Sequence, residues 1–104
     1  MAAFTTSLDG GVAVVRISGE LDIASHGELL AHTEPLLRSD AKVVALDVAD
    51  VTFIDSSGLG ALVRLQQQAV DAGRSLRLRN PPRPVTRILS LTGLADLFPT
   101  DTDQ

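Results

Sequence analysis

The segment of this chain best placed to do chemistry is DSSGLG at residues 55–60, between an apolar stretch and a helical pattern. The start of a helix offers free backbone N–H groups and the positive end of the helix dipole, and both favour an anion. A phosphate on Ser56 would therefore be tolerated, and it would add about −1.5 to −2 charge beside Asp55. Such a charge could repel an acidic partner or block a flat, partly apolar contact.

The same segment also has a purely structural interpretation. A serine is a common N-cap, because its side-chain oxygen accepts a hydrogen bond from a backbone N–H of the first helical turn. Gly58 and Gly60 each cost about 1 kcal/mol relative to alanine within a helix, so they need a physical reason. Close approach of another backbone or of a protein surface would be one. The residues alone leave open whether a serine here caps the helix or carries a phosphate.

No arrangement of side chains indicates catalysis. His26 and His32 are six residues apart, which does not place both on one metal as an i, i+4 pair does. Neither serine of the segment lies in a G-x-S-x-G elbow, and Val63 stands where a nucleotide-binding fingerprint needs its third glycine. The chain has no cysteine. We therefore predict a protein that is not an enzyme and that has no metal and no cofactor.

Length and composition indicate one small globular domain. The chain has 104 residues, of which 44% are hydrophobic and 21% charged, the balance of an ordinary single-core domain. No apolar run approaches the roughly 20 residues that span a bilayer, and the N-terminus lacks a signal-peptide pattern. We expect a single domain over 1–104, with a flexible acidic tail from about residue 100, in a cytoplasmic protein that does not contact a membrane.

Charge is distributed unevenly along the chain. Residues 1–60 carry nine acids and three bases, whereas residues 61–104 carry four acids and six bases. A nucleic-acid-binding protein would use such a basic stretch, but the net charge is −4 and no aromatic residue interleaves with the arginines. We predict solvated surface arginines and no nucleic-acid partner. The arginines of this stretch are Arg74, Arg77, Arg79, Arg83 and Arg87.

Hydrophobic patterns and turn residues predict alternating strands and helices. The expected elements are strands over 4–8 and 12–18, a helix after residue 25, a buried strand over 43–48, a loop over 50–55, a helix over 57–72, a strand over 75–78 and a short helix over 85–91. We predict an α/β fold with a mixed sheet. An initial antiparallel hairpin is followed by parallel strands, and the helices pack mainly on one face.

The first helix carries two local signals. The sequence SHGE at residues 25–28 is typical of a capping box, in which the Ser25 hydroxyl and the Glu28 carboxylate satisfy each other's backbone N–H groups. Pro35 lies within the helical pattern and removes a hydrogen bond there. We therefore expect a kinked or late-starting helix. Its apolar stripe consists of Leu29, Leu30, Leu36 and Leu37.

Two motifs in the predicted order of elements resemble a known family. GELD at residues 19–22 follows the second strand, and DSSGLG at residues 55–60 precedes the second long helix. This pairing resembles the anti-sigma factor antagonists, which are stand-alone STAS domains of bacteria. The resemblance covers nearly the whole chain, including TGL at residues 92–94, and it implies a STAS fold over 1–104.

The resemblance implies a regulatory switch. In that family the first serine after the motif's aspartate, here Ser56, is phosphorylated by a partner that is both a kinase and the anti-sigma factor. The unphosphorylated antagonist binds this partner and frees a sigma factor, and a serine phosphatase reverses the modification. Asp22 matches the family's aspartate near the phosphorylation site. The partner-binding positions that match the second motif are Asp55, Ser57, Gly58 and Leu59.

A second role within the same fold stays open. A non-catalytic STAS subunit can dock permanently on the ATPase of an ABC-type transporter, through the helix beside the second motif. Such members often lose the phosphorylatable serine, whereas Ser56 and Ser57 are both present here.

Overall fold

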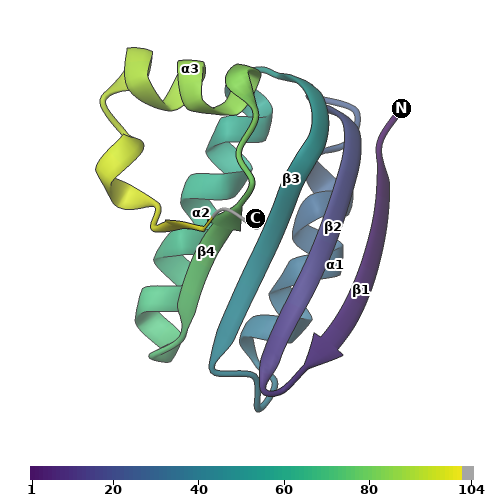
Figure 1. The fold of residues 1–104 in the computed structure, drawn as a ribbon, viewed down its shortest axis with the longest axis vertical. Helices are drawn as coiled ribbons and strands as arrows, with labels where there is room; N and C mark the ends of the chain where they lie inside the picture. The colour runs from purple at the N-terminus through teal and green to yellow at the C-terminus, as the bar shows by residue number, and fades with distance from the viewer. Residues whose placement is uncertain (102–104) are drawn as a thin grey trace.

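The structure is a computed structural model that describes residues 1–101, so residues 102–104 of the expected tail lie outside the described residues. Thr100 and Asp101, also expected in the flexible tail, instead form a short strand. In chain order the elements (Figure 1) are β1 (Ala3–Asp9), β2 (Val12–Leu21), α1 (His26–Leu37), β3 (Val43–Ile54), α2 (Ser56–Ala72), β4 (Ser75–Arg79), α3 (Arg83–Thr92), the 3-10 helix η1 (Ala95–Leu97) and β5 (Thr100–Asp101).

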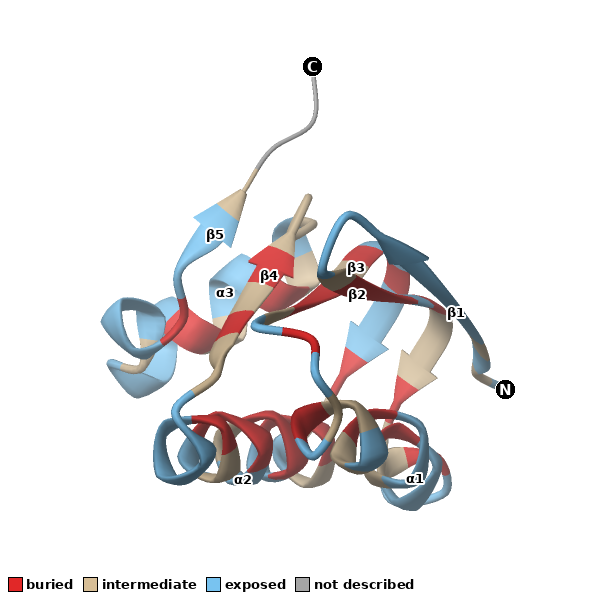
Figure 2. Ribbon diagram, turned by 90° about the horizontal axis from the view of Figure 1, so that it is seen from below, coloured by how far each residue is buried: buried red, intermediate tan, exposed pale blue. Residues whose placement is uncertain are grey.

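The described strands form one five-stranded sheet with the order β1-β2-β3-β4-β5. β1 pairs with β2 antiparallel, and each later pair is parallel. Both α1 and α2 cover one face of this sheet (Figure 2), which confirms the predicted fold class. Because β2, β3 and β4 run in one direction, their carboxyl ends meet the starts of the helices at one end of the molecule (Figure 1).

The core between the sheet and the helices is aliphatic. Along β2, Ala13, Val15 and Ile17 are buried and Arg16 is exposed, as the period of two predicts. Leucines from α1, α2 and β4 meet these side chains in one cluster. None of the helices in residues 1–101 is both long enough and apolar enough to cross a membrane.

The strand β3 is much longer than predicted. Residues 50–54, expected in a loop, continue β3 up to Ile54, and β2 likewise extends to Leu21. The two strands pair along their full length, with register shifts after Arg16 and after Gly19. Each irregularity inserts an unpaired residue and shifts the alternation of buried side chains. The alternation of buried and exposed residues is therefore lost at the ends of β2 and β3, and for this reason the pattern does not predict that the strands continue there.

The helix α1 starts directly after Ser25, so the late start is wrong. Pro35 lies in the last turn, where the missing N–H interrupts the hydrogen-bond ladder only near its end. Leu29 and Leu37 of the predicted apolar stripe are buried, and Leu30 and Leu36 pack partly buried against the core.

Two of the arginines expected on the solvated surface are structural. Arg74 donates from Nη2 to the carbonyl oxygen of Ser39 at 2.7 Å. Arg77 donates two hydrogen bonds to the Asp101 carboxylate, at 2.8 and 2.7 Å, and these hold the pKa of Asp101 below its usual value. The prediction of a solvated surface is therefore wrong for these two, whereas Arg83 and Arg87 are exposed as expected.

Gln66 links the helix α2 to the end of the chain. Its side chain is buried, and Nε2 donates to the carbonyl oxygen of Leu97 at 2.6 Å and more weakly to that of Leu76 at 3.5 Å. Both partners lie outside α2, so the residue pattern of the helix alone does not indicate this role.

Replacing Gln66 by alanine should lower the free energy of unfolding by about 1–2 kcal/mol, because a buried amide and its carbonyl partner lose their hydrogen bond. The neighbouring Gln67 is exposed, so Gln67→Ala should change the same quantity by less than about 0.5 kcal/mol. Urea denaturation of both variants measures the difference. Equal losses in the two variants would contradict this role for Gln66.

Candidate functional site

The two motifs meet at one end of the sheet. Leu21 pairs with Ile54 near the carboxyl ends of the parallel strands β2 and β3, so the next residues, Asp22 and Asp55, lie at the same edge. The N–H of Asp55 donates to the carbonyl oxygen of Leu21 at 3.1 Å. We call Asp22 together with residues 55–60 the motif edge. It lies at the top of the molecule in Figure 1, where α1 and α2 begin.

Asp55, not a serine, is the N-cap of α2. Its Oδ1 accepts hydrogen bonds from the backbone N–H of Ser57 at 2.8 Å and of Gly58 at 3.1 Å. A carboxylate suits this position because it accepts two bonds and complements the positive end of the helix dipole. The interpretation of a serine as the N-cap is therefore wrong, and the helix begins at Ser56, one residue earlier than predicted.

The Ser56 hydroxyl is exposed and has no structural task in the described part of the chain. Ser56 is the first helical residue of α2 and is exposed. Its side chain makes no hydrogen bond to any residue within 1–101. Ser57 is half-buried, and its N–H is occupied by Asp55. Of the two serines, Ser56 is the more accessible to a modifying enzyme.

The two glycines of the motif edge have different surroundings. A Cβ on Gly58 would lie 2.3 Å from the carbonyl oxygen of Leu21, whereas a Cβ on Gly60 would meet nothing within 4 Å. Close approach of another backbone, one of the two reasons expected from the sequence, is thus found at Gly58. Gly60 is exposed, four residues after Ser56 and so on the same helix face. That spacing is the signal that could have singled out Gly60 beforehand.

Gly58 and Leu59 are the buried residues of the motif edge. Gly58 is buried against the end of β2, and Leu59 is 7% exposed and belongs to the core. The family resemblance predicts that both residues contact a partner, but both are buried in this structure. The exposed positions of the motif edge are Ser56 and Gly60.

Asp22 organises the turn that leads into α1. Its Oδ1 accepts from the N–H of Ala24 at 3.0 Å and of Ser25 at 3.1 Å. The Ser25 hydroxyl donates to the carbonyl oxygen of Glu20 at 2.6 Å and accepts from the N–H of Asp22 at 3.0 Å. The predicted capping box is therefore wrong. The Ser25 hydroxyl bonds backward to the end of β2, and it makes no cap hydrogen bond to the helix.

Removing the Asp55 carboxylate should destabilise the fold by about 1 kcal/mol, because two N–H groups of the first helical turn lose their acceptor. Asn keeps an acceptor oxygen at this position, so we expect Asp55→Asn to lie within a few tenths of a kcal/mol of wild type and Asp55→Ala to show the full loss. Thermal unfolding followed by circular dichroism compares the two. An equal loss in both variants would argue against the cap.

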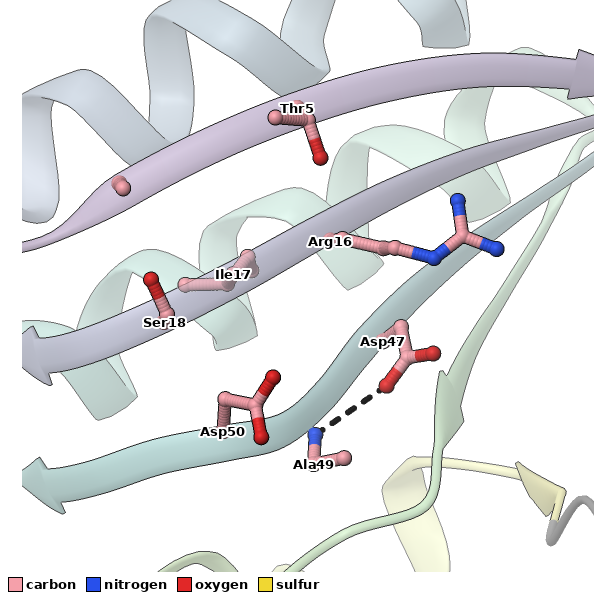
Figure 3. Close-up of a pocket in the computed structure, with 8 residues that line it drawn as sticks. Thr5, Arg16, Ile17, Ser18, Asp47, Ala49 and Asp50 are labelled. Carbon is pink, nitrogen blue, oxygen red and sulfur yellow. Dashed lines mark hydrogen bonds between the residues drawn. The ribbon is translucent and has the colours of Figure 1, made fainter.

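The histidines considered as metal ligands, His26 and His32, both lie on α1. Within residues 1–101 no group of three or more His, Cys, Asp or Glu could hold a metal ion, and the His32 ring stacks on Phe4 at 4.9 Å. A hollow of about 310 Å³, lined by both charged and apolar residues, lies on the sheet. Figure 3 shows Arg16, Asp47 and Asp50 around it. None of its lining residues belongs to the motif edge.

Comparisons with known proteins agree on one family. The family model described as Mlab, STAS domain, matches residues 4–99. The chain is similar to the anti-sigma-B factor antagonist of Bacillus subtilis, with 34% identity over 84 residues that make up 81% of this chain and 76% of that protein.

Solved structures share the fold. An anti-sigma factor antagonist from Mycobacterium paratuberculosis has a TM-score of 0.87 and 23% identity, covering 97% of this chain and 86% of that one. The Bacillus cell fate determinant SpoIIAA, in its phosphorylated form, has a TM-score of 0.76 and 20% identity, covering 98% and 92%.

Proposed function

This chain belongs to the anti-sigma factor antagonist family of STAS domains, and we propose that it is an antagonist controlled by phosphorylation of Ser56. In the unphosphorylated state it binds an anti-sigma factor that also has serine kinase activity, and the sigma factor is released. The partner then phosphorylates Ser56 and dissociates. A serine phosphatase removes the phosphate and restores binding.

The observation that carries this proposal is the position of the Ser56 hydroxyl. It is exposed at the first residue of α2, and Asp55 performs the capping that a serine often performs. A phosphate on Ser56 would thus displace no hydrogen bond of the described structure and no core contact. The helix dipole favours an anion at this position. Phosphorylation is therefore compatible with the intact fold.

The same phosphate would change the surface strongly. It would add about −1.5 to −2 charge next to the Asp55 carboxylate and at the same sheet edge as Asp22. A partner surface that accommodates a neutral hydroxyl would have to bury a dianion that already has acidic neighbours. Like charges brought together at an interface oppose binding. The switch acts by removing complementarity, while the fold is retained.

Gly60 supports a close contact at this surface. The fold does not require a glycine there, since a Cβ would meet nothing within 4 Å, and the residue lies one turn after Ser56. A glycine on an exposed helix face lets a partner's backbone approach closely. The neighbourhood of Ser56 thus suits a flat contact that a phosphate would block.

The proposal is tested by incubating the purified chain with ATP and, one at a time, the anti-sigma factors of its source organism. Intact mass and peptide mapping should find one phosphate on Ser56, and Ser56→Ala should take up none although Ser57 remains. Absence of phosphate with every anti-sigma factor, or a phosphate found only on Ser57, would contradict the proposal. Constant co-purification with a transporter ATPase and no phosphate would favour the transporter-subunit role.

A further inference from the structure

A groove with an apolar floor and two arginines lies between the end of β3 and the helix α3. It has a volume of about 500 Å³. We call it the α3 groove and define it by six of the residues that line it, namely Phe53, Ile54, Arg83, Arg87, Ile88 and Leu91. In Figure 1, α3 lies at the end of the molecule where β3 finishes.

The floor of the α3 groove leaves large apolar side chains in solvent. Phe53 is 50% exposed and Leu91 is 76% exposed, and Ile88 is half-buried. β4 pairs with β3 only as far as Asp47, so none of the described strands continues beside Phe53 on that side. Clustered exposed apolar side chains with polar residues at the rim are typical of protein interaction sites.

The two arginines of the α3 groove have no partner within residues 1–101. Arg83 and Arg87 are four residues apart and therefore lie on one face of α3, and both are exposed. Neither side chain makes a hydrogen bond or an ion pair with a described residue. No acidic residue lines the groove, although the chain as a whole has a net charge of −4. The groove is locally basic on an acidic protein.

We propose that the α3 groove binds an acidic amphipathic segment of the anti-sigma factor. Apolar side chains of that segment would cover Phe53 and Leu91, and its carboxylates would pair with Arg83 and Arg87. Charge complementarity selects an acidic segment, and the apolar floor selects a protein over a nucleic acid. β3 leads from Phe53 and Ile54 directly into Asp55 and Ser56, so the groove continues the proposed binding surface. The partner's identity rests on the proposed function, whereas the groove itself does not.

The test is the double charge reversal Arg83→Glu with Arg87→Glu, titrated with the purified anti-sigma factor in a calorimeter. We expect the affinity to fall at least tenfold. The control is Arg38→Glu, an exposed arginine at the far end of α1, which should change the affinity less than twofold. Phe53→Ser tests the apolar floor with both charges kept, and it should weaken binding at least threefold. Circular dichroism confirms that each variant is folded.

Ser56→Asp in the same titration separates the two proposals. If Ser56→Asp weakens binding and the groove variants match Arg38→Glu, the groove proposal is wrong and the switch stands. If the groove variants weaken binding and Ser56→Asp does not, the switch is wrong and the groove stands. Self-association or binding to a DNA duplex that the double charge reversal abolishes would overturn the assignment of the occupant.

If the wild-type chain binds none of the anti-sigma factors, the proposed function fails and a peptide pair tests the groove. One helical peptide carries leucines at i, i+4 and i+7 flanked by glutamates, and its twin carries lysines in place of the glutamates. Amide NMR shifts of Phe53 and Leu91 with the glutamate peptide alone would support the groove. Equal shifts with both peptides, shifts elsewhere, or none with either would overturn it.

Discussion

Replacing Ser56 by aspartate should lower the affinity for the anti-sigma factor by about a hundredfold, whereas Ser56→Ala should bind within about threefold of wild type. Like charges brought together at an interface cost several kcal/mol, and about 2.7 kcal/mol corresponds to a hundredfold. The alanine variant keeps the neutral surface and removes only the acceptor of the phosphate. It should therefore bind its partner continuously, even after incubation with ATP.

The control for this prediction is an aspartate placed elsewhere on the surface. Ser7 is exposed on β1, and its hydroxyl accepts from Arg16 at 3.1 Å, so the fold tolerates Ser7→Asp. Its register partner Val14 lies near the start of β2, at the end of the sheet opposite the motif edge. We expect Ser7→Asp to change the affinity less than twofold in the same calorimetric titration. Wild-type affinity of Ser56→Asp would require abandoning the electrostatic switch.

Thermal unfolding separates a surface effect from damage to the fold. Ser56→Asp should melt within a few degrees of wild type, because the Ser56 side chain is exposed and its helix position favours an anion. A large drop in melting temperature would instead indicate that the charge disturbs the cap made by Asp55. A loss of affinity would then say nothing about complementarity.

Local patterns were sufficient to predict the order of elements from β1 to α3. The initial hairpin follows from Gly10 and Gly11, which both have positive φ in the turn between β1 and β2, and from the core-facing positions Ala13, Val15 and Ile17 of β2. The nearness of Asp22 to the second motif was implied by the family resemblance, and parallel strands, whose carboxyl ends share one edge of a sheet, explain it. These features depend on residues close in sequence or on a general rule of topology.

Features that depend on distant partners could not be predicted in this way. The Ser25 hydroxyl donates to the carbonyl oxygen of Glu20. A local capping pattern does not include this acceptor, which competes with the helix for the hydroxyl. The end of β3 is a strand because β2 supplies its backbone partners across two register shifts. Gln66 is buried because Leu97 offers it an acceptor. In each case a contact across the fold overrides the local signal.

The two glycines of the motif edge should respond to alanine with opposite signs. In Gly58→Ala the new Cβ would lie 2.3 Å from the carbonyl oxygen of Leu21. That oxygen belongs to backbone, which cannot swing away as a flexible side chain could. We expect a loss of about 2–3 kcal/mol in the free energy of unfolding, typical of overpacking against rigid surroundings. Gly60→Ala meets open space and should gain about 0.5–1 kcal/mol from the better helix propensity of alanine.

Urea denaturation of the two variants, followed by titration with the anti-sigma factor, distinguishes the two roles. Gly58→Ala should weaken binding through the fold, because it pushes the end of β2 away from the cap at Asp55. Gly60→Ala should be more stable than wild type and still bind less tightly, because its methyl group lies on the face that Ser56 shares. A stabilised Gly60→Ala with unchanged affinity would remove Gly60 from the binding surface. A loss of stability in both variants would contradict the open space around Gly60, and with it the reason for treating that glycine as part of the contact.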